Sequence, residues 1–398
     1  MTNLPQGWEV KKLEEIANIK GGKRLPKGEN LLDNNTKFAY IRVADFQDNG
    51  TINLQNIKFI NENTYNVLKN YKIYDDNLYI SIAGTIGKSG IIPKELNGAI
   101  LTENAVKLEY IQNNISNKFM YFFTLSNIFK TQIQTSTKIV AQPKLAITRL
   151  KQIQIPLPPL KEQERIVGIL DESFAKIDES IKILEQNLLN LDELMQSALQ
   201  KAFNPLKDNA KENYKLPQSW EWKSLEEISE NISAGGDKPK NCTESKTAKN
   251  QIPVYANGVN NNGLVGYTDK ATIIKPSLTI SARGTIGFVC IRKEPYFPIV
   301  RLISLIPCEN ILCLHYLYFC LNFFIAKGEG SSIPQLTIPK FKSLQIPLPP
   351  LKEQEQIAKH LDFVFEKTKA LKELYTKELK DYEELKQSLL NKAFKGEL

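Results

Sequence analysis

The stretch QIPLPPLKEQE occurs twice in this chain, at residues 154–164 and again at residues 345–355. Eleven identical residues in a row do not recur by chance, so the chain contains an internal duplication. The same offset of 191 residues aligns the flanking sequence without a gap and carries Phe203 onto Phe394. The sequence therefore predicts two halves with one layout, in which a strand-like segment and a proline block precede a helix.

A long helix is predicted directly after each proline block. The Leu-Pro-Pro segment at 157–159 cannot lie inside a helix, because proline lacks the backbone N–H and its ring clashes with the preceding turn. The prolines can instead fix the direction in which the chain enters the helix. We expect the first helix to begin near Lys161, with Glu162 in its positively polarised first turn, and to end after Phe203.

Apolar residues in these helices recur at alternating spacings of four and three, which is the pattern of a coiled-coil seam. The predicted helix-packing residues of the first copy are Leu170, Phe174, Ile177, Ile181, Leu184, Leu188 and Leu191. Those of the second copy are Leu361, Phe365, Tyr375, Leu379, Tyr382 and Leu389. Because Lys372 and Lys386 interrupt the second seam, we expect that helix to rotate locally and to pack through Leu371, Leu374 and Leu385. The two helices are expected to pair with each other; the alternative is two separate, solvent-facing helices.

Length and composition limit the class of protein. With 398 residues, 42% hydrophobic and 24% charged, the chain has the composition of a soluble globular protein with room for two or more domains. Its net charge of +8 favours polyanionic partners. The sequence shows neither the apolar length of a membrane span nor the apolar core of a signal peptide, so we expect a cytoplasmic protein without a membrane partner.

The chain lacks the residue patterns of common catalytic and metal sites. Its five cysteines all fall in the second half without a C-x-x-C pair, which indicates neither a disulfide framework nor a zinc site. It has two histidines, and it has no H-E-x-x-H, G-x-S-x-G, Walker, dinucleotide-binding or DNA amino-methyltransferase motif. We therefore expect recognition rather than chemistry, and no metal.

The two halves share further landmarks. Each opens with a tryptophan-containing segment, at 4–16 and at 216–228, whose leucine and isoleucine predict a short packed helix. Strands are predicted at FAYIRV (38–43), TIIK (272–275) and LTIS (278–281), and buried helices at the aromatic-rich segments 119–129 and 314–325. The spacing between landmarks differs in the two halves, so a common frame is predicted to carry two different recognition regions.

Three recurring features carry candidate contacts to phosphates or bases. They are the glycine-rich loops at 21–28 and 235–240, the turns at the repeated GTIG (84–87 and 284–287), and the polar segments ahead of the proline blocks. The first GTIG resembles a phosphate loop, but Ile82 stands where a Walker motif needs glycine, so nucleotide binding is rejected. The candidate DNA-contacting residues are Lys23, Arg24, Lys27, Arg42, Lys88, Ser89, Lys144, Lys238, Lys240, Arg283, Gln335 and Lys340.

The repeated order of variable region, IPLPPLKEQ block and long helix resembles the DNA-specificity subunit of type I restriction-modification enzymes, over essentially the whole chain. This resemblance implies an α+β protein with two pseudo-symmetric α/β target-recognition domains, separated by two long antiparallel helices that form a coiled coil. Each domain is expected to bind one half of a split, asymmetric DNA sequence. The expected domains are recognition domain 1 at 1–153, the first proline block and helix at 154–206, recognition domain 2 at 207–344, and the second block and helix at 345–398.

The resemblance also implies partners. They are double-stranded DNA, two methyltransferase subunits that carry the S-adenosylmethionine chemistry, and restriction subunits that use ATP and Mg. No cofactor is expected to bind this chain itself. A helix from Lys161 to Phe203 would span roughly 65 Å at about 1.5 Å per residue, against about 34 Å for one turn of B-DNA. The helices are therefore long enough to serve as a spacer between two recognition domains.

Two other functions fit the same residues less well. One is a single-chain DNA methyltransferase with an unrecognised active site, which binding of S-adenosylmethionine by the isolated chain would indicate. The other is a coiled-coil adaptor without DNA binding, which a salt-sensitive gel shift would exclude.

Overall fold

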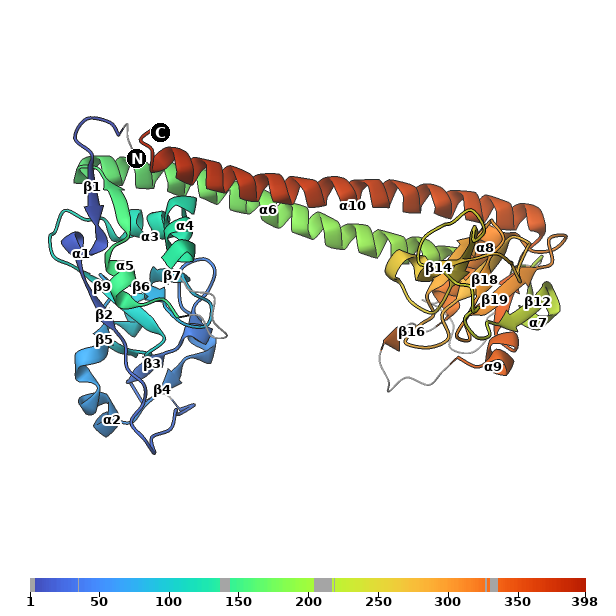
Figure 1. The fold of residues 1–398 in the computed structure, drawn as a ribbon, viewed down its shortest axis with the longest axis horizontal. Coiled ribbons are helices and arrows are strands. Elements are labelled where there is room, and N and C mark those ends of the chain that lie inside the picture. Colours follow the sequence, from blue (N-terminus) through green and yellow to red (C-terminus); the bar gives the residue numbers. More distant parts are fainter. Residues whose placement is uncertain are drawn as a thin grey trace. The chain divides into compact units, whose positions relative to one another are not determined.

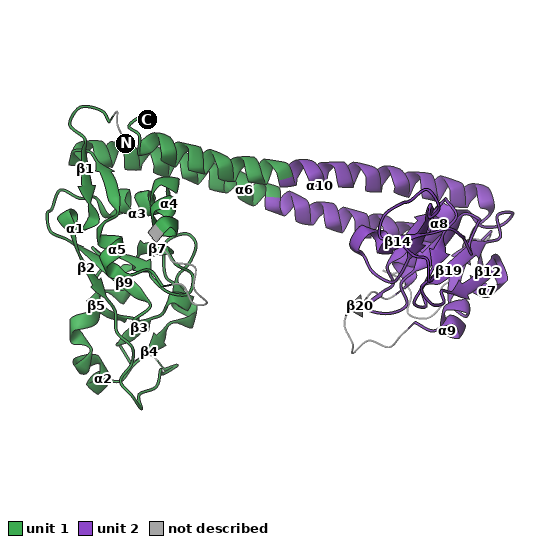
Figure 2. Ribbon diagram, in the orientation of Figure 1, with its two compact units in different colours: residues 1–184, 377–398 green, residues 185–376 purple. Residues whose placement is uncertain are grey.

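The protein forms two compact units, and both long helices are divided between them. The computed structural model describes residues 4–34, 36–136, 144–203, 217, 219–325, 328–329 and 336–398. Unit 1 comprises Met1–Leu184 and Lys377–Leu398, and unit 2 comprises Glu185–Thr376 (Figures 1 and 2). Helix α6 (Leu160–Phe203) therefore begins in unit 1 and ends in unit 2, and α10 (Leu351–Ala393) does the reverse. The predicted bounds treat each long helix as a segment separate from the recognition domains. The two units instead share each helix, so they do not test those bounds.

Unit 1 contains two four-stranded sheets in its described residues, with strand orders β2-β9-β6-β7 and β4-β3-β8-β5. The first sheet is antiparallel throughout, whereas β3 and β8 pair in parallel. The strands of unit 1 are β1 (Glu9–Lys12), β2 (Ala17–Gly21), β3 (Ala39–Ile41), β4 (Lys58–Phe59), β5 (Lys72–Ile73), β6 (Leu78–Ser81), β7 (Ser89–Ile91), β8 (Ala99–Leu101), β9 (Ala105–Tyr110) and β10 (Gln154–Leu157). Besides α6 and α10, its α-helices are α1 (Leu13–Ile16), α2 (Glu62–Val67), α3 (Asn117–Leu125), α4 (Asn127–Ser136) and α5 (Ile147–Lys151).

Unit 2 repeats this topology. Its main sheet has the order β12-β19-β15-β17, which matches β2-β9-β6-β7, and the pair β13 and β18 is parallel like β3 and β8. Its strands are β11 (Glu221–Ser224), β12 (Ser229–Ala234), β13 (Ile252–Tyr255), β14 (Leu264–Thr268), β15 (Ser277–Ile280), β16 (Thr285–Ile286), β17 (Val289–Arg292), β18 (Phe297–Pro298), β19 (Ile303–Pro307), β20 (Gly328–Glu329) and β21 (Gln345–Leu348). Its further helices are α7 (Leu225–Ile228), α8 (Leu314–Phe324) and α9 (Ile338–Lys342). The duplication and the α+β class are thereby confirmed.

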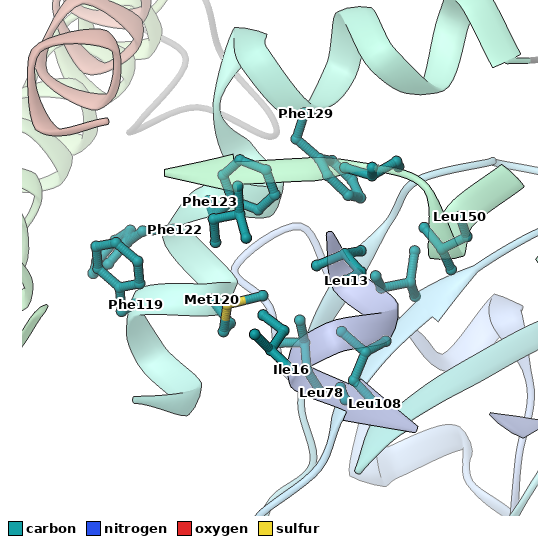
Figure 3. Close-up of a cluster of buried hydrophobic side chains, with 14 of the residues drawn as sticks. Leu13, Ile16, Leu78, Leu108, Phe119, Met120, Phe122, Phe123, Phe129 and Leu150 are labelled. Carbon is teal, nitrogen blue, oxygen red and sulfur yellow. The ribbon is translucent and has the colours of Figure 1, made fainter. Parts of the chain in front are cut away.

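The aromatic-rich segment of unit 1 forms two helices instead of the single one predicted. Ser126 has an extended backbone, with φ −73° and ψ 153°, and ends α3. Its buried hydroxyl accepts a hydrogen bond from the Phe129 N–H at 3.3 Å, so Ser126 caps the start of α4. The helices still bury their aromatic side chains, and Figure 3 shows Phe119, Phe123 and Phe129 in the same hydrophobic cluster as Leu13.

One predicted strand does not form. The TIIK segment at 272–275 contributes only an isolated bridge between Ile273 and Tyr296, and Ile274 is 71% exposed. Pro276 follows directly and has no N–H to donate to a ladder, so a strand cannot continue through it. The next predicted strand, LTIS, is confirmed as β15.

Each proline block joins a short strand to a long helix. The QIPL residues form β10 and β21, which pair antiparallel with β1 and β11, the strands that follow Trp8 and Trp220. The helices α6 and α10 then begin at Leu160 and Leu351, directly after the two consecutive prolines. The predicted helix start is confirmed to within one residue.

The glutamine of the first KEQE segment ties the start of α6 to α3. Gln163 is 1% exposed, and its Oε1 accepts a hydrogen bond from the Ser116 N–H at 2.8 Å. Its Nε2 donates to the carbonyl oxygens of Asn114 at 3.1 Å and Pro158 at 2.9 Å. One side chain therefore satisfies three backbone groups from two segments. We call this arrangement the glutamine clamp of unit 1.

Unit 2 contains the same clamp, centred on Gln354. Its Oε1 accepts from the Cys313 N–H at 2.9 Å, and its Nε2 donates to the carbonyl oxygens of Ile311 and Pro349, both at 2.8 Å. Gln354 is fully buried. The identity of the two KEQE segments thus has a structural explanation, because the same backbone groups require the same side chain.

In unit 1 the end of α10 packs against the beginning of α6. Ile166 and Leu170 share a hydrophobic core with Leu390 and Phe394, and further along the helices Asp178 pairs with Lys386 at 2.5 Å. The residue numbers change in opposite directions, so the two segments are antiparallel. The ring of Phe394 lies 5.1 Å from that of Phe119 and 5.4 Å from that of Phe123, which belong to α3.

Unit 2 shows the reciprocal arrangement. Leu199 and Phe203, at the end of α6, share a core with Leu361 near the start of α10. The Phe203 ring lies 5.4 Å from the ring of Tyr316 on α8. The ammonium of Lys372 pairs with Asp192, so these segments are antiparallel as well. Each half of the sequence therefore supplies a phenylalanine to the core of the unit that contains the other half's recognition domain.

The second seam does not rotate as predicted. All the predicted helix-packing residues are buried or partly buried, whereas Leu371, Leu374 and Leu385 are 38%, 49% and 45% exposed. Lys372 and Lys386 keep their seam positions. Their alkyl stems pack between the helices while their ammonium groups reach a carboxylate of α6, which removes the reason for rotation.

Exchanging the charge of Lys386 tests this part of the seam. The side chain of Lys386 is 17% exposed, so Lys386→Asp places a second carboxylate beside Asp178 in a partly buried position. We expect a loss of unit 1 stability on the order of 1 kcal/mol, most of which is recovered by adding Asp178→Lys. Urea unfolding would be followed by the fluorescence of Trp8 in a Trp220→Phe, Trp222→Phe background. Additive losses in the double variant would show that the two side chains do not interact.

The matched control for this exchange is Lys380→Asp on the same helix. The Lys380 side chain is 77% exposed and pairs with Glu384 one turn along α10. Its replacement is expected to change stability by no more than a few tenths of a kcal/mol.

Candidate nucleic-acid interface

In unit 1, three loops meet at one end of the main sheet, and two of them carry predicted contacts. The end of β2 and the end of β6 both pair with the start of β9, through Gly21 with Val106 and Ser81 with Ala105. The glycine-rich loop follows β2, the GTIG turn follows β6, and the β8–β9 turn precedes β9. We call this set of loops the sheet end of unit 1. The corresponding loops of unit 2 follow β12 and β15 and precede β19, and we call them the sheet end of unit 2.

The repeated GTIG forms the same turn in both units. Gly87 N–H donates to the Ser81 carbonyl at 2.9 Å, and Gly287 N–H donates to the Ser281 carbonyl at 3.0 Å. The four glycines of the two motifs have φ between 75° and 88°, a conformation that side chains disfavour. The predicted tight turn after a strand is confirmed.

Three predicted contact residues of unit 1 have partners within the unit, although the Lys88 pair lies at the surface. Lys88 pairs with Asp48 at 2.8 Å. Ser89 is 4% exposed and shares a hydrogen bond with the Thr124 hydroxyl at 2.6 Å. The side chain of Ser89 is therefore not available at the surface.

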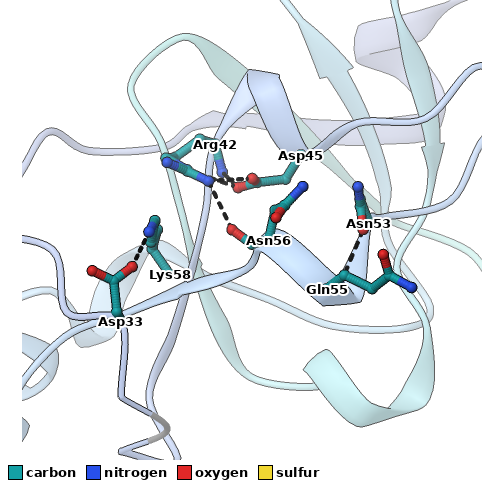
Figure 4. A network of polar contacts seen from close by, with 7 residues as sticks. All are labelled: Asp33, Arg42, Asp45, Asn53, Gln55, Asn56 and Lys58. Carbon is teal, nitrogen blue, oxygen red and sulfur yellow. Dashed lines mark hydrogen bonds and ion pairs between the residues drawn. The ribbon is translucent and has the colours of Figure 1, made fainter.

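Arg42, the third of these residues, belongs to an internal polar network (Figure 4). Its guanidinium donates to both carboxylate oxygens of the buried Asp45, at 2.5 and 3.0 Å, and to the Asn56 carbonyl at 2.9 Å. Asp45 also accepts from the Arg42 N–H at 2.7 Å and so fixes the 3-10 turn that follows β3. We interpret Arg42 as a structural residue, because its guanidinium already donates hydrogen bonds to Asp45 and Asn56.

The cations of the first glycine-rich loop, at residues 21–28, are exposed. Lys23 is held by its N–H, which donates to the Leu101 carbonyl at 2.9 Å. The Arg24 side chain is 79% exposed and pairs with Glu103 at 2.9 Å, and this hydrogen bond raises the pKa of Arg24. Burial opposes the ionisation of Glu103, but hydrogen bonds from Arg24 and Thr102 outweigh it and lower the pKa of Glu103.

Lys144 and Lys27 complete the predicted set in unit 1, and both are exposed. Lys144 forms a β-bridge with Ala83, directly ahead of the first GTIG, so the segment before α5 lies beside that turn. Lys27 lies further along the loop that follows β2. Lys23, Arg24 and Lys144 thus lie on adjoining backbone segments although they are far apart in sequence.

In unit 2, the described candidates Lys238, Lys240, Arg283 and Lys340 are all exposed. Arg283 directly precedes Gly284 of the second GTIG, and Lys238 lies in the loop that follows β12. Lys340 lies on α9, the short helix that precedes the second proline block. Gln335 lies outside the described residues. Whether any of these residues contacts DNA stays a prediction.

The sequence does not single out the turns between β8 and β9 and between β18 and β19. The N–H of Gly22 donates to the Ala105 carbonyl at 3.0 Å, and that of Gly235 donates to the Leu302 carbonyl at 2.8 Å, so the two turns correspond at an offset of 197 residues. Neither turn contains a recurring motif. Their correspondence is visible only through the strand pairing.

Within the described residues, no group of three or more histidine, cysteine, aspartate or glutamate side chains is placed to hold a metal ion. In the same part of the chain, no helix combines the length and hydrophobicity needed to cross a membrane.

A family model and a relative of known family place this chain in the same protein family. The family model of the type I restriction modification DNA specificity domain matches residues 5–189 and 217–381. A Mycoplasma pneumoniae protein named as type I specificity subunit S.MpnORF507P is 29% identical over 357 residues, which are 88% of this chain and 87% of that protein.

Two solved structures share the fold. One chain of a type I R-M system superposes with a TM-score of 0.82 at 20% identity and covers 100% of both chains. The HsdS subunit from Thermoanaerobacter tengcongensis superposes with a TM-score of 0.61 at 21% identity and covers 100% of this chain and 98% of that one. With its duplicated topology and a family match over both halves, the chain belongs to the type I restriction modification DNA specificity family.

Proposed function

We propose that this chain is the DNA-recognition subunit of a type I restriction-modification complex and that it binds a split, asymmetric target. Each unit would recognise one half of the target through its sheet end, and the long helices would serve as the spacer. The observation that carries this proposal is the contrast within the duplication. The glutamine clamps and GTIG turns are the same in both units, whereas the exposed residues at the two sheet ends differ.

That contrast is what recognition of two different half-sites requires. Lysine and arginine contacts to phosphates provide salt-dependent affinity without sequence information, so sequence must be recognised by side chains that reach base edges. The sheet end of unit 1 presents Arg24 beside Glu103, whereas that of unit 2 presents Arg283 and Lys238. One frame with two different sets of exposed side chains fits a target with two different halves.

We also propose that the long helices dock the partner subunits. Several apolar side chains outside the seam are exposed, at 38–60% of their surface. Such side chains do not stabilise the helix pair by themselves, but they would be buried by a partner protein. They are Ile183, Leu189 and Leu194 on α6 and Phe363, Leu371, Leu374 and Leu385 on α10.

The partners in this proposal are two methyltransferase subunits, which bind S-adenosylmethionine, and restriction subunits, which use ATP and Mg. In the proposal this chain contributes recognition and no catalytic group, binds no cofactor itself, and acts in the cytoplasm.

Exchange of one recognition region tests the assignment of one half-site to each unit. Residues 20–150 would be replaced by the corresponding region of a relative, because this range contains the sheet end of unit 1 and leaves the proline block intact. The hybrid would be co-expressed with its methyltransferase subunits, and modified adenines would be mapped by long-read sequencing. We expect one half-site to change and the other to keep its sequence. A change in both half-sites would contradict the assignment, and an unsplit motif would contradict the proposed function.

A further inference from the structure

The turn between β18 and β19 in unit 2 has an unfavourable backbone. Val300 has φ 53° and Arg301 has φ 60°, so two consecutive residues other than glycine lie in the left-handed region. This conformation costs an L-residue about 1–2 kcal/mol, and it is rare above all for β-branched residues such as valine. Glycine at these positions would relieve the strain, yet the chain carries a β-branched valine and a long arginine there.

Hydrogen bonds from the sheet end hold the strained turn in place. The N–H groups of Val300 and Arg301 donate to the carbonyl oxygens of Gly236 and Gly235, both at 2.8 Å. The Val300 carbonyl in turn accepts from the Asn257 amide at 2.7 Å. The backbone is thus fixed on both sides, while Val300 is 52% exposed and Arg301 is exposed as well.

Asn257 connects this turn to the second GTIG turn. While its Nδ2 donates to Val300, its Oδ1 accepts from the Ala282 N–H at 2.8 Å. Ala282 directly precedes Arg283, so one amide group holds the two backbone segments that carry Arg301 and Arg283. Both arginines are therefore presented from fixed backbone at the sheet end of unit 2.

The corresponding turn of unit 1 has different chemistry. Glu103 and Asn104 occupy the positions of Val300 and Arg301, and neither has a positive φ. Glu103 pairs with Arg24, whereas none of the ion pairs among the described residues includes Arg301. The corresponding turns thus differ in charge: that of unit 1 carries the acidic Glu103, and that of unit 2 carries the cationic Arg301.

We propose that the Val300–Arg301 turn is the base-contacting element of unit 2, in which Arg301 recognises a guanine through its O6 and N7 acceptors. This inference rests on the proposed function. A guanidinium presents two parallel donors that match those two acceptors, and this contact requires a fixed backbone, which the strained turn provides. Phosphate contacts need only a cation, and the exposed Lys238 and Lys240 of the neighbouring loop can supply them. Val300 would contact the methyl group of an adjacent thymine.

The test is sequence selection from randomised duplex DNA by the full chain assembled with its methyltransferase subunits. Arg301→Ala is expected to remove the preference for guanine at one position of one half-site and to weaken binding of the original target roughly 10- to 100-fold. Arg301→Lys keeps the charge but loses the paired donors, so it should relax the same position while the salt dependence of binding stays unchanged. The other half-site should keep its sequence in both variants.

Three outcomes would overturn the inference. Unchanged selection by Arg301→Ala would show that the residue makes no specific contact. Uniform weakening across all sequences, with a salt slope lower by about 1, would show a phosphate contact instead. If the unaltered complex selects no sequence, the proposed function fails together with the inference.

The matched control is Lys293→Ala. Lys293 is an exposed cation of the same unit, and it follows Arg292, which pairs with Ser277 at the opposite end of the main sheet. Its replacement is expected to leave the selected sequence unchanged. Thermal unfolding of each variant would verify that the turn substitutions leave unit 2 folded.

Discussion

Replacing Phe394 with alanine is expected to destabilise unit 1 by about 3–5 kcal/mol, the usual cost of deleting a buried aromatic ring. Phe394 follows the last helical residue of α10, is 1% exposed, and packs against Phe119 and Phe123 of α3. The recognition domain at the start of the chain thus depends on a residue at the far end of the sequence. Urea unfolding followed by Trp8 fluorescence, in a Trp220→Phe, Trp222→Phe background, would measure the loss.

The duplication provides a matched pair for this experiment. Phe203→Ala removes the equivalent ring from unit 2, where Phe203 contacts Tyr316, and the tryptophans of unit 2 would report it in a Trp8→Phe background. We expect each substitution to lower the unfolding midpoint of its own unit. Phe363→Ala, at a position 60% exposed on α10, should change neither midpoint appreciably. A loss confined to unit 2 for Phe394→Ala would contradict the reciprocal packing.

Gln354→Met is expected to destabilise unit 2 by about 2–4 kcal/mol, because backbone groups buried without a hydrogen-bond partner cost about 1–3 kcal/mol each. Methionine has a similar shape, so the packing volume is retained. Its thioether has no donor for the Ile311 and Pro349 carbonyls, and its sulfur is only a weak acceptor for the Cys313 N–H. The unfolding free energy, measured with the tryptophans of unit 2, would test the expectation.

Gln163→Met should have the same effect on unit 1, since that clamp makes the same three hydrogen bonds. Gln186→Met, at an exposed position of α6 within unit 2, serves as the control for Gln354→Met. Equal stability of the clamp variants and the control would show that water replaces the lost hydrogen bonds. The identity of the two KEQE segments would then need a different explanation.

The sequence predicted the frame of this protein well, because the frame is where the two halves agree. An identical block with helical spacing after it was sufficient to place both long helices, their pairing and their packing residues. The prediction that the second helix rotates locally was wrong for a physical reason. A hydrophobicity pattern counts Lys372 and Lys386 as interruptions, whereas in the fold their stems pack and their ammonium groups reach carboxylates of the other helix.

The surroundings of the candidate contact residues could be predicted only in part. A cation is visible in the sequence, but its partner in the fold is not, so the pairing of Arg42 with Asp45 and of Lys88 with Asp48 could not be predicted. The Val300–Arg301 turn could not be predicted, because its distinguishing feature is a backbone angle. Valine and arginine give no sign of a left-handed turn in a sequence.

The reciprocal helix ends have a consequence for synthesis on the ribosome. The residues Met1–Leu184 emerge first, but unit 1 is complete only with Lys377–Leu398, so its Phe394 site stays open while the whole of unit 2 is translated. Contacts so distant in sequence form slowly, and an open apolar site on a nascent chain is prone to aggregation. The domain that is made first therefore finishes folding last, and chaperones would have their longest opportunity to act on it.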